Sequence, residues 1–268
     1  MSSSLIKTLK ASKLSEQYII TPRLNEFLMR TPNLVVDAWI ADLIYDQITK
    51  QPRYRPGAFS SSSAGNCLRQ QVYQFLGVDS GGVNGPQLQS IFNDGTWRHL
   101  RWQATLMQAG IITHIEFPLT WGRMRSIGTV DGAGLVPANH PNTAWRNKEF
   151  GFELKGMNSW GWKYAATNGV KIPHNNQVHR YFLSSGFDLF VIIYENKDTQ
   201  EWLEWVVEPD PTLLDEQREE LRVLNEYVDK KQIPPMLPGC VSKKGPEWKK
   251  ELCPFAGDKG VCVRRNLW

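Results

Sequence analysis

The segment Glu149-Phe-Gly-Phe-Glu-Leu-Lys155 is predicted to be a β-strand. Residues two apart in a strand share a face, so Glu153 and Lys155 project together from it. Leu154, between them, points into the core and leaves its carbonyl oxygen nearby. The segment therefore places an acid, an amine and a carbonyl at one position of a predicted sheet.

Two further β-rich runs precede this strand, at residues 111–119 and 125–136, and Gly, Pro or Asn residues separate them. The three runs together predict an antiparallel meander. One long helix precedes the meander, and a helix and two strands follow it, at residues 87–109, 175–185, 189–194 and 201–207. This mixed order predicts an α/β fold around a central mixed sheet.

The chain divides into three predicted regions. Residues 1–57 form a helical amino-terminal region broken by prolines, and residues 58–231 hold the core described above. Residues 232–268 form a basic tail that contains three of the four cysteines. A charged helix over 211–231 closes the core.

Composition narrows the class of protein. The 268 residues are 41% apolar, and the longest apolar run, 189–194, is far shorter than the ~20 residues of a membrane-spanning helix. The first residues lack the pattern of a secretory signal, so we expect a cytoplasmic protein, in the host cytoplasm if a phage encodes it. The net charge is +4, with two basic regions on either side of an acidic stretch at 198–229. The two basic regions either border a groove that binds phosphate or belong to the ordinary charged surface in contact with solvent.

A second acid, Asp131 in Gly128-Thr-Val-Asp-Gly132, lies on the strand before Glu153. Two carboxylates and a carbonyl on adjacent strands form the hard-oxygen site that Mg²⁺ or Mn²⁺ prefers. Lys155 beside them would hold the attacking water and offset charge on a phosphate. The alternative is structural, because Asp-Gly is common in hairpin turns and Glu-x-Lys is a common exposed strand pair.

Asp131 followed by Glu153-x-Lys155 resembles the core of the PD-(D/E)XK nuclease superfamily. His99 on the long helix and Gln177-Val-His-Arg-Tyr181 on the next helix resemble motifs of its RecB-like branch. The resemblance spans about residues 58–265 and implies a restriction-endonuclease-like core of helix, three-strand meander, helix and strand. It also implies that His99, Asp131, Glu153 and the Leu154 carbonyl hold one or two Mg²⁺ or Mn²⁺ ions, while Gln177 and Tyr181 contact the substrate strand.

The four cysteines are Cys67, Cys240, Cys253 and Cys262. Four thiolates suit a tetrahedral Zn²⁺ or an iron-sulfur cluster, and the alternative is four unconnected buried thiols. Cys67 with the terminal Cys253-Pro-Phe resembles the iron-staple nucleases, the AddB subunit and the CRISPR-associated nuclease family four. That resemblance implies a 4Fe-4S cluster joining the chain ends, although the last three cysteines are spaced more widely here than in those relatives.

The sequence thus predicts a metal-dependent deoxyribonuclease, with exonuclease action on single-stranded or duplex ends preferred. Arg69, Arg98 and Arg180 are weaker candidates for phosphate contacts, and Lys243, Lys244, Lys249 and Lys250 with Trp248 for a DNA-binding finger. Recombination, helicase or CRISPR-adaptation proteins are possible partners, and the oligomeric state stays open. Two alternatives remain: an inactive nuclease-fold subunit that binds DNA or a partner, and a zinc-stapled structural module.

Overall fold

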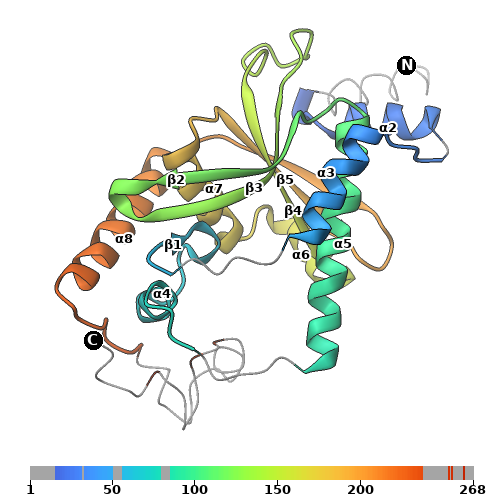
Figure 1. Ribbon diagram of the computed structural model, residues 1–268. Coiled ribbons are helices and arrows are strands. Elements are labelled where there is room, and N and C mark those ends of the chain that lie inside the picture. The colour runs from blue at the N-terminus through green and yellow to red at the C-terminus, as the bar shows by residue number, and fades with distance from the viewer. Residues whose placement is uncertain are drawn as a thin grey trace.

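The computed structural model describes residues 16–31, 33–50, 56–79, 85–237, 253, 255 and 262. In this part of the chain, helices lie on both sides of a six-stranded sheet (Figure 1). The strands follow the order β1-β3-β4-β5-β6, and β2 pairs with β3. Their bounds are Phe59–Ser60 (β1), His114–Trp121 (β2), Ser126–Leu135 (β3), Glu149–Met157 (β4), Leu189–Asn196 (β5) and Trp202–Val207 (β6).

The sheet is mixed, as the order of elements predicts. Strands β2, β3 and β4 pair antiparallel, which confirms the meander. Strand β5 runs parallel to β4, and β6 pairs antiparallel with β5. A parallel pair requires a crossover connection, which here contains two helices, α6 (Ser159–Asn168) and α7 (Ile172–Ser185).

The remaining helices precede the sheet, lead into the meander or close the core. They are α2 (Thr21–Arg30), α3 (Ala38–Thr49), α4 (Leu68–Phe75), α5 (Pro86–Gln108) and α8 (Pro211–Asp229), with short 3-10 turns η1 (Ser61–Ser63) and η2 (Gly122–Met124). The predicted α/β class and the sequence helix, meander, helix, strand are confirmed. Helix α6 was not predicted, because the Ser-Trp-Gly-Trp sequence at its start contains a poor helix former. Asn158 starts the helix by accepting a hydrogen bond from the Gly161 amide.

Two apolar clusters lie on opposite faces of the sheet. The first core cluster joins α2, α3 and α5 to one face, and alternate residues of β4 and β5 contribute to it: Phe150, Phe152, Leu154, Leu189, Val191 and Ile193. The second core cluster joins α6 and α7 to the other face and includes Phe190, Ile192 and Tyr194. Strand β5 is buried along its whole length for this reason, which agrees with its uninterrupted apolar sequence.

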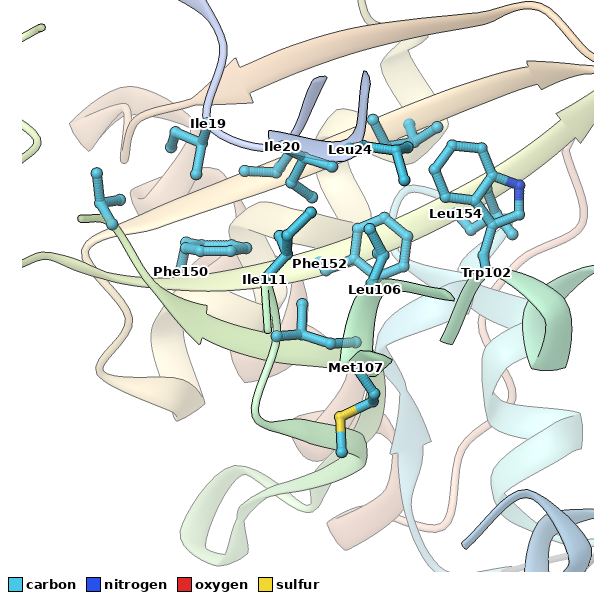
Figure 2. Close-up of a cluster of buried hydrophobic side chains, with 14 of the residues drawn as sticks. Ile19, Ile20, Leu24, Trp102, Leu106, Met107, Ile111, Phe150, Phe152 and Leu154 are labelled. Atoms are coloured by element: carbon cyan, nitrogen blue, oxygen red, sulfur yellow. The ribbon is translucent and has the colours of Figure 1, made fainter. Parts of the chain in front are cut away.

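The amino-terminal helices belong to the first core cluster (Figure 2). Ile19, Ile20 and Leu24 pack there beside the side chains of α5 and β4. The start of α2 is fixed by Glu204 on β6, whose carboxylate accepts hydrogen bonds from the amides of residues 19, 20 and 21 at 2.6, 2.9 and 2.6 Å. A buried acid thus supplies the cap that the local sequence of α2 lacks.

Strands β3 and β4 separate part of the way along their length. Their ladder runs from Leu135↔Glu149 to Gly132↔Phe152 and ends there. The far end of β3, at Ser126 and Ile127, pairs instead with β1. We call the opening between these two pairings the fork.

Among the described residues, no helix is long and apolar enough to cross a membrane.

Candidate active site

Asp131 lies on β3 at the mouth of the fork, one residue before the last paired position. Its Oδ2 accepts a hydrogen bond of 2.7 Å from the backbone amide of Leu154, two residues beyond Phe152, the last residue of β4 that pairs with β3. A side chain thus replaces a ladder bond that the separating strands cannot make. The Leu154 side chain is fully buried, as predicted, so only its backbone faces the fork.

At this same position, the regular alternation of side chains between the two faces of the sheet is interrupted in β2 and β3. On β2, Ile115 packs against the first core cluster and Phe117 against the second, although two residues of a regular strand would share a face. Glu116 between them has a left-handed backbone with φ of 49°. On β3, Val130 lies in the second cluster, whereas a Cβ on Gly132 would meet Ile112 of the first. The change of face leaves Asp131 between the two helix layers.

His99 reaches Asp131 from α5, in the first of these layers. Its Nδ1 lies 3.1 Å from Asp131 Oδ1, and 32% of the His99 side chain is exposed. Burial favours the neutral imidazole, but the carboxylates of Asp131 and Glu153 outweigh it and raise the pKa of His99. The imidazole and the two acids therefore influence one another directly.

Glu153 and Lys155 project toward the other layer, as the strand periodicity predicts. Lys155 Nζ lies 2.6 Å from Glu153 Oε1, and only 4% of the Glu153 side chain is exposed. Burial and the nearby charge of Asp131 raise the pKa of Glu153 to about 7. Burial lowers the pKa of Lys155, but the Glu153 and Asp131 charges more than offset that and raise it.

Gln177 and Tyr181 lie on one face of α7 and contact this acid. Gln177 Nε2 donates to Glu153 Oε1 at 2.9 Å and to the Tyr181 hydroxyl at 2.7 Å. The hydroxyl in turn donates to the carbonyl of Thr129, a residue of β3 inside the fork. The predicted helical spacing therefore brings both side chains to the site, where they also join α7 to the open part of the sheet.

Glu153, Lys155, Gln177 and Tyr181 line a pocket of about 940 Å³, which we call the cleft. Its walls include polar side chains from η1, β2, β4 and α7 and from the residue after α3: Lys50, Ser62, Ser63, Glu116, Glu153, Lys155, Gln177 and Tyr181. Six residues from four elements thus lie around one opening of the sheet: His99, Asp131, Glu153, Lys155, Gln177 and Tyr181.

Glu116 is a candidate site residue that the sequence analysis missed. Gln103, fully buried on α5, donates its amide to Glu116 Oε1 at 2.7 Å and to the backbone carbonyl of Asp131 at 2.9 Å. Burial raises the pKa of Glu116, and the Asp131 carboxylate raises it further. In sequence, Ile-Glu-Phe-Pro looks like an ordinary strand with one exposed acid, so no local signal marks this residue.

The oxygen atoms around the fork fit a divalent cation. Glu153 Oε2 is buried, and no described residue donates a hydrogen bond to it, whereas Oε1 accepts bonds from Lys155 and Gln177. An unpartnered carboxylate oxygen beside Asp131 and His99 is the atom expected to bind a cation. As the side chains lie, no three His, Cys, Asp or Glu residues of the described ranges converge into a metal-binding group. His99 and Lys155 contact the carboxylates instead.

The three arginines predicted to contact phosphate lie elsewhere. Arg180 is completely buried and pairs with Glu220 at 2.7 Å, and it also bonds to Gln71. Arg98 pairs with Glu195 and Asp94, and Arg69 donates to Tyr73 and to the Pro234 carbonyl. Each of the three guanidinium groups thus makes contacts that join helices or strands to other parts of the protein. These contacts argue against phosphate binding by the three arginines, whose predicted role stays a prediction.

Three of the four predicted cluster cysteines gather around Tyr73 on α4. Cys253 and Cys262 pack against the apolar cluster of Tyr73 and Phe255. Burial raises the pKa of Tyr73, and the nearby thiols of Cys262 and Cys67 contribute to the same direction. The described residues Cys253, Phe255 and Cys262 therefore lie close to α4. Cys240 and the predicted finger with Lys243, Lys244, Trp248, Lys249 and Lys250 lie outside the described residues.

Comparison with known proteins gives only distant similarity. No protein-family model and no curated protein matches the sequence. Among solved structures, the chain is similar to SSO0001, with 14% identity and a TM-score of 0.47 over 81% of this chain and 91% of that one. It is also similar to LHK-Exo bound to dAMP, with 14% identity and a TM-score of 0.47 over 65% of this chain and 89% of that one. A second LHK-Exo structure, titled as an alkaline exonuclease from Laribacter hongkongensis, has 13% identity and a TM-score of 0.42 over 66% of this chain and 90% of that one.

Proposed function

We propose that this protein is a divalent-metal-dependent DNA nuclease of the RecB-like type that hydrolyses phosphodiester bonds. One observation supports this above the others: an imidazole, two carboxylates and an amine from three separate elements meet at the fork, and one buried carboxylate oxygen has no partner among the described residues. A structural role explains the bonded oxygen of Glu153, but it does not explain a buried carboxylate oxygen that accepts no hydrogen bond from the described residues.

His99, Asp131, Glu153 and the Leu154 carbonyl would hold Mg²⁺ or Mn²⁺, which when bound polarises the phosphate and activates a water. Lys155 would then leave Glu153 and donate to the attacking water or to the phosphate oxygens. Gln177 keeps the Glu153 carboxylate oriented, and Tyr181 positions Gln177. Both would contact the substrate strand in the cleft.

The cysteines would form a second metal centre, away from the cleft. Cys67, Cys253 and Cys262 gather near Tyr73, and Cys240 would complete a set of four for a 4Fe-4S cluster, or for Zn²⁺. Such a centre would close the long loop between Cys67 and the tail, which constrains the unfolded chain. Anaerobically purified protein with brown absorbance near about 400 nm would support iron-sulfur. A colourless sample containing zinc would reject it.

The proposed context is the processing of DNA ends in recombination, repair, CRISPR adaptation or phage replication, inside the cytoplasm. Exonuclease action is the preferred mode. It is tested by incubating end-labelled linear DNA and covalently closed circular DNA with Mg²⁺ or Mn²⁺. Release of nucleotides from the linear form alone supports an exonuclease.

The matched variants are Asp131→Asn and Lys155→Met, with Glu216→Gln on the exposed side of α8 as control. Both site variants should lose at least about a hundredfold in rate, while the control keeps its rate. Wild-type protein that binds DNA but cleaves none would point to the alternative, an inactive nuclease-fold subunit.

A further inference from the structure

Two large aromatic side chains face solvent on α6, directly after the strand that bears Glu153 and Lys155. Trp160 is 75% exposed and Tyr164 is 50% exposed. Their ring centroids lie 6.1 Å apart with planes 27° from parallel, so the two rings stack. Leaving this much apolar area in water is unfavourable, and packing among the residues that the structure describes gives no reason for it.

The third aromatic residue of this part of α6 behaves differently. Trp162 packs against the second core cluster and donates its indole N–H to the Tyr194 carbonyl. The inward face of α6 is therefore complete without Trp160 and Tyr164. A structural role accounts for Trp162 and leaves the stacked pair unexplained.

The stacked pair is held rigidly relative to the cleft. The Ser159 amide and hydroxyl both donate to Asp198, at 2.9 and 2.5 Å, which fixes the first turn of α6 to the end of β5. Tyr194 on β5 is the register partner of Lys155 on β4. Because Trp162 also bonds to Tyr194, the helix and the proposed catalytic lysine are both attached to one residue of β5.

Two lysine side chains lie near the stacked pair. The Lys171 amide and His174 Nδ1 are both within hydrogen-bond distance of the Tyr194 hydroxyl, at 3.0 and 2.9 Å. A Cβ placed on Gly161 would lie 3.4 Å from Lys171 Nζ, so that ammonium lies beside the first turn of α6. Lys163 is exposed and lies between Trp160 and Tyr164 in the sequence of α6.

We propose that Trp160 and Tyr164 form a stacking platform for the bases of a single-stranded segment of the DNA substrate, with Lys163 and Lys171 on its phosphates. This inference rests on the proposed nuclease function and specifies its substrate class. Stacking on an aromatic side chain requires an open base face, which a single strand offers and a duplex covers. Positive charge alone would serve both forms of DNA equally.

The test measures binding separately from cleavage. Fluorescence anisotropy of the full-length protein in EDTA is recorded with a labelled oligo-dT single strand and with a blunt duplex hairpin of equal charge. Trp160→Leu removes the ring but keeps an apolar side chain, Trp160→Phe keeps a ring, and Trp39→Leu changes another exposed tryptophan, on α3.

Trp160→Leu should weaken single-strand binding about 5- to 100-fold and change duplex binding less than about twofold. Trp160→Phe should recover most of the loss, and Trp39→Leu should bind like wild type. Lys163→Gln should reduce the salt slope of single-strand binding by about 0.7. Unchanged single-strand affinity in Trp160→Leu, or an equal loss on the duplex, overturns the platform.

The outcome is distinguishable from failure of the proposed function. If the protein cleaves DNA and Trp160→Leu binds normally, the platform is wrong and the nuclease stands. If Trp160→Leu selectively loses single-strand binding and wild type cleaves nothing, the platform stands and the nuclease is wrong.

Discussion

Lys155 Nζ lies 2.6 Å from Glu153 Oε1 in the wall of the cleft, and the second oxygen of that carboxylate has no partner among the described residues. One oxygen of the Glu153 carboxylate is thus hydrogen-bonded, and the other is not bonded to any described residue. The pKa of Glu153 is raised to about 7, first by burial and then by Asp131, so the protein bears an electrostatic cost at this position when the acid is ionised. Costs of this kind are typical of sites that bind a cation.

The first prediction concerns stability without metal. Between about pH 4.5 and pH 7 the folded protein keeps a proton on Glu153 that the unfolded chain releases, so this residue makes stability fall as the pH rises through that window. Glu153→Gln removes the dependence. The unfolding free energy of the variant minus that of wild type should be larger at pH 8 than at pH 4.5, by about 1–3 kcal/mol. Urea unfolding in EDTA measures this, and an equal difference at both pH values contradicts it.

A second prediction concerns metal affinity and His99. The Asp131 and Glu153 charges, working against burial, raise the pKa of His99, and a protonated imidazole cannot bind a metal. Mn²⁺ affinity should therefore decline as the pH falls through the neutral range. In His99→Gln the affinity should be weaker at pH 8 and decline less steeply. Titration calorimetry at pH 6, 7 and 8 checks both statements; parallel curves for the two proteins would rule out a role for His99.

Glu116 gives a third prediction. Gln103 fixes this acid next to Asp131, so it should contribute to the cation site directly or through a water. Glu116→Gln should weaken Mn²⁺ binding about tenfold in calorimetry. Glu149→Gln, an exposed acid at the other end of β4, is the matched control and should bind as wild type does. Equal affinities of Glu116→Gln and wild type would remove Glu116 from the site.

The fourth prediction tests the packing of Tyr181 against the sheet. A Cβ on Gly128 would lie 2.6 Å from Tyr181 Cε1 and 2.9 Å from Ser61 Oγ. Gly128→Ala should therefore cost about 1–3 kcal/mol of unfolding free energy and displace the Tyr181 ring. Gly95→Ala, in the interior of α5 where a Cβ meets nothing within 4 Å, should be neutral or stabilising by up to about 1 kcal/mol. Chemical denaturation compares the two, and equal effects would refute the steric explanation.

The fifth prediction separates structural arginines from DNA contacts. Glu220→Ala leaves the Arg180 guanidinium buried without its acid and should cost about 3 kcal/mol of unfolding free energy. DNA affinity per folded molecule should stay the same, because Arg180 does not reach the surface. Unfolding curves and anisotropy on the same samples measure both. Tighter DNA binding, which a guanidinium released from its acid would give if it reached a phosphate, would restore the phosphate-contact role.

Much of the fold could be predicted because its signals are local. The unbroken apolar run of β5 indicates a strand covered on both faces, and Pro211 after the Asp210 cap indicates the start of α8. The two-residue spacing of Glu153 and Lys155 and the four-residue spacing of Gln177 and Tyr181 placed each pair on one face. These relations need only the period of the element.

The parts that could not be predicted depend on distant residues. A strand with period two would put Ile115 and Phe117 on one side, and only the three-dimensional arrangement shows the change of face at Glu116. Arg180 has the sequence context of a surface cation, because Glu220 and Gln71, which enclose it, are far along the chain. The role of Asp131 as acceptor for the Leu154 amide likewise follows from where the ladder ends.

That ending of the ladder has a consequence for protein engineering. Transplanting His99, Asp131, Glu153 and Lys155 onto a regular antiparallel sheet would not reproduce the centre, since an intact ladder would occupy the Leu154 amide and close the gap that Tyr181 spans. A designer would have to copy the interruption of the backbone pairing first. The missing hydrogen bonds of this sheet are as much a component of the centre as the side chains themselves.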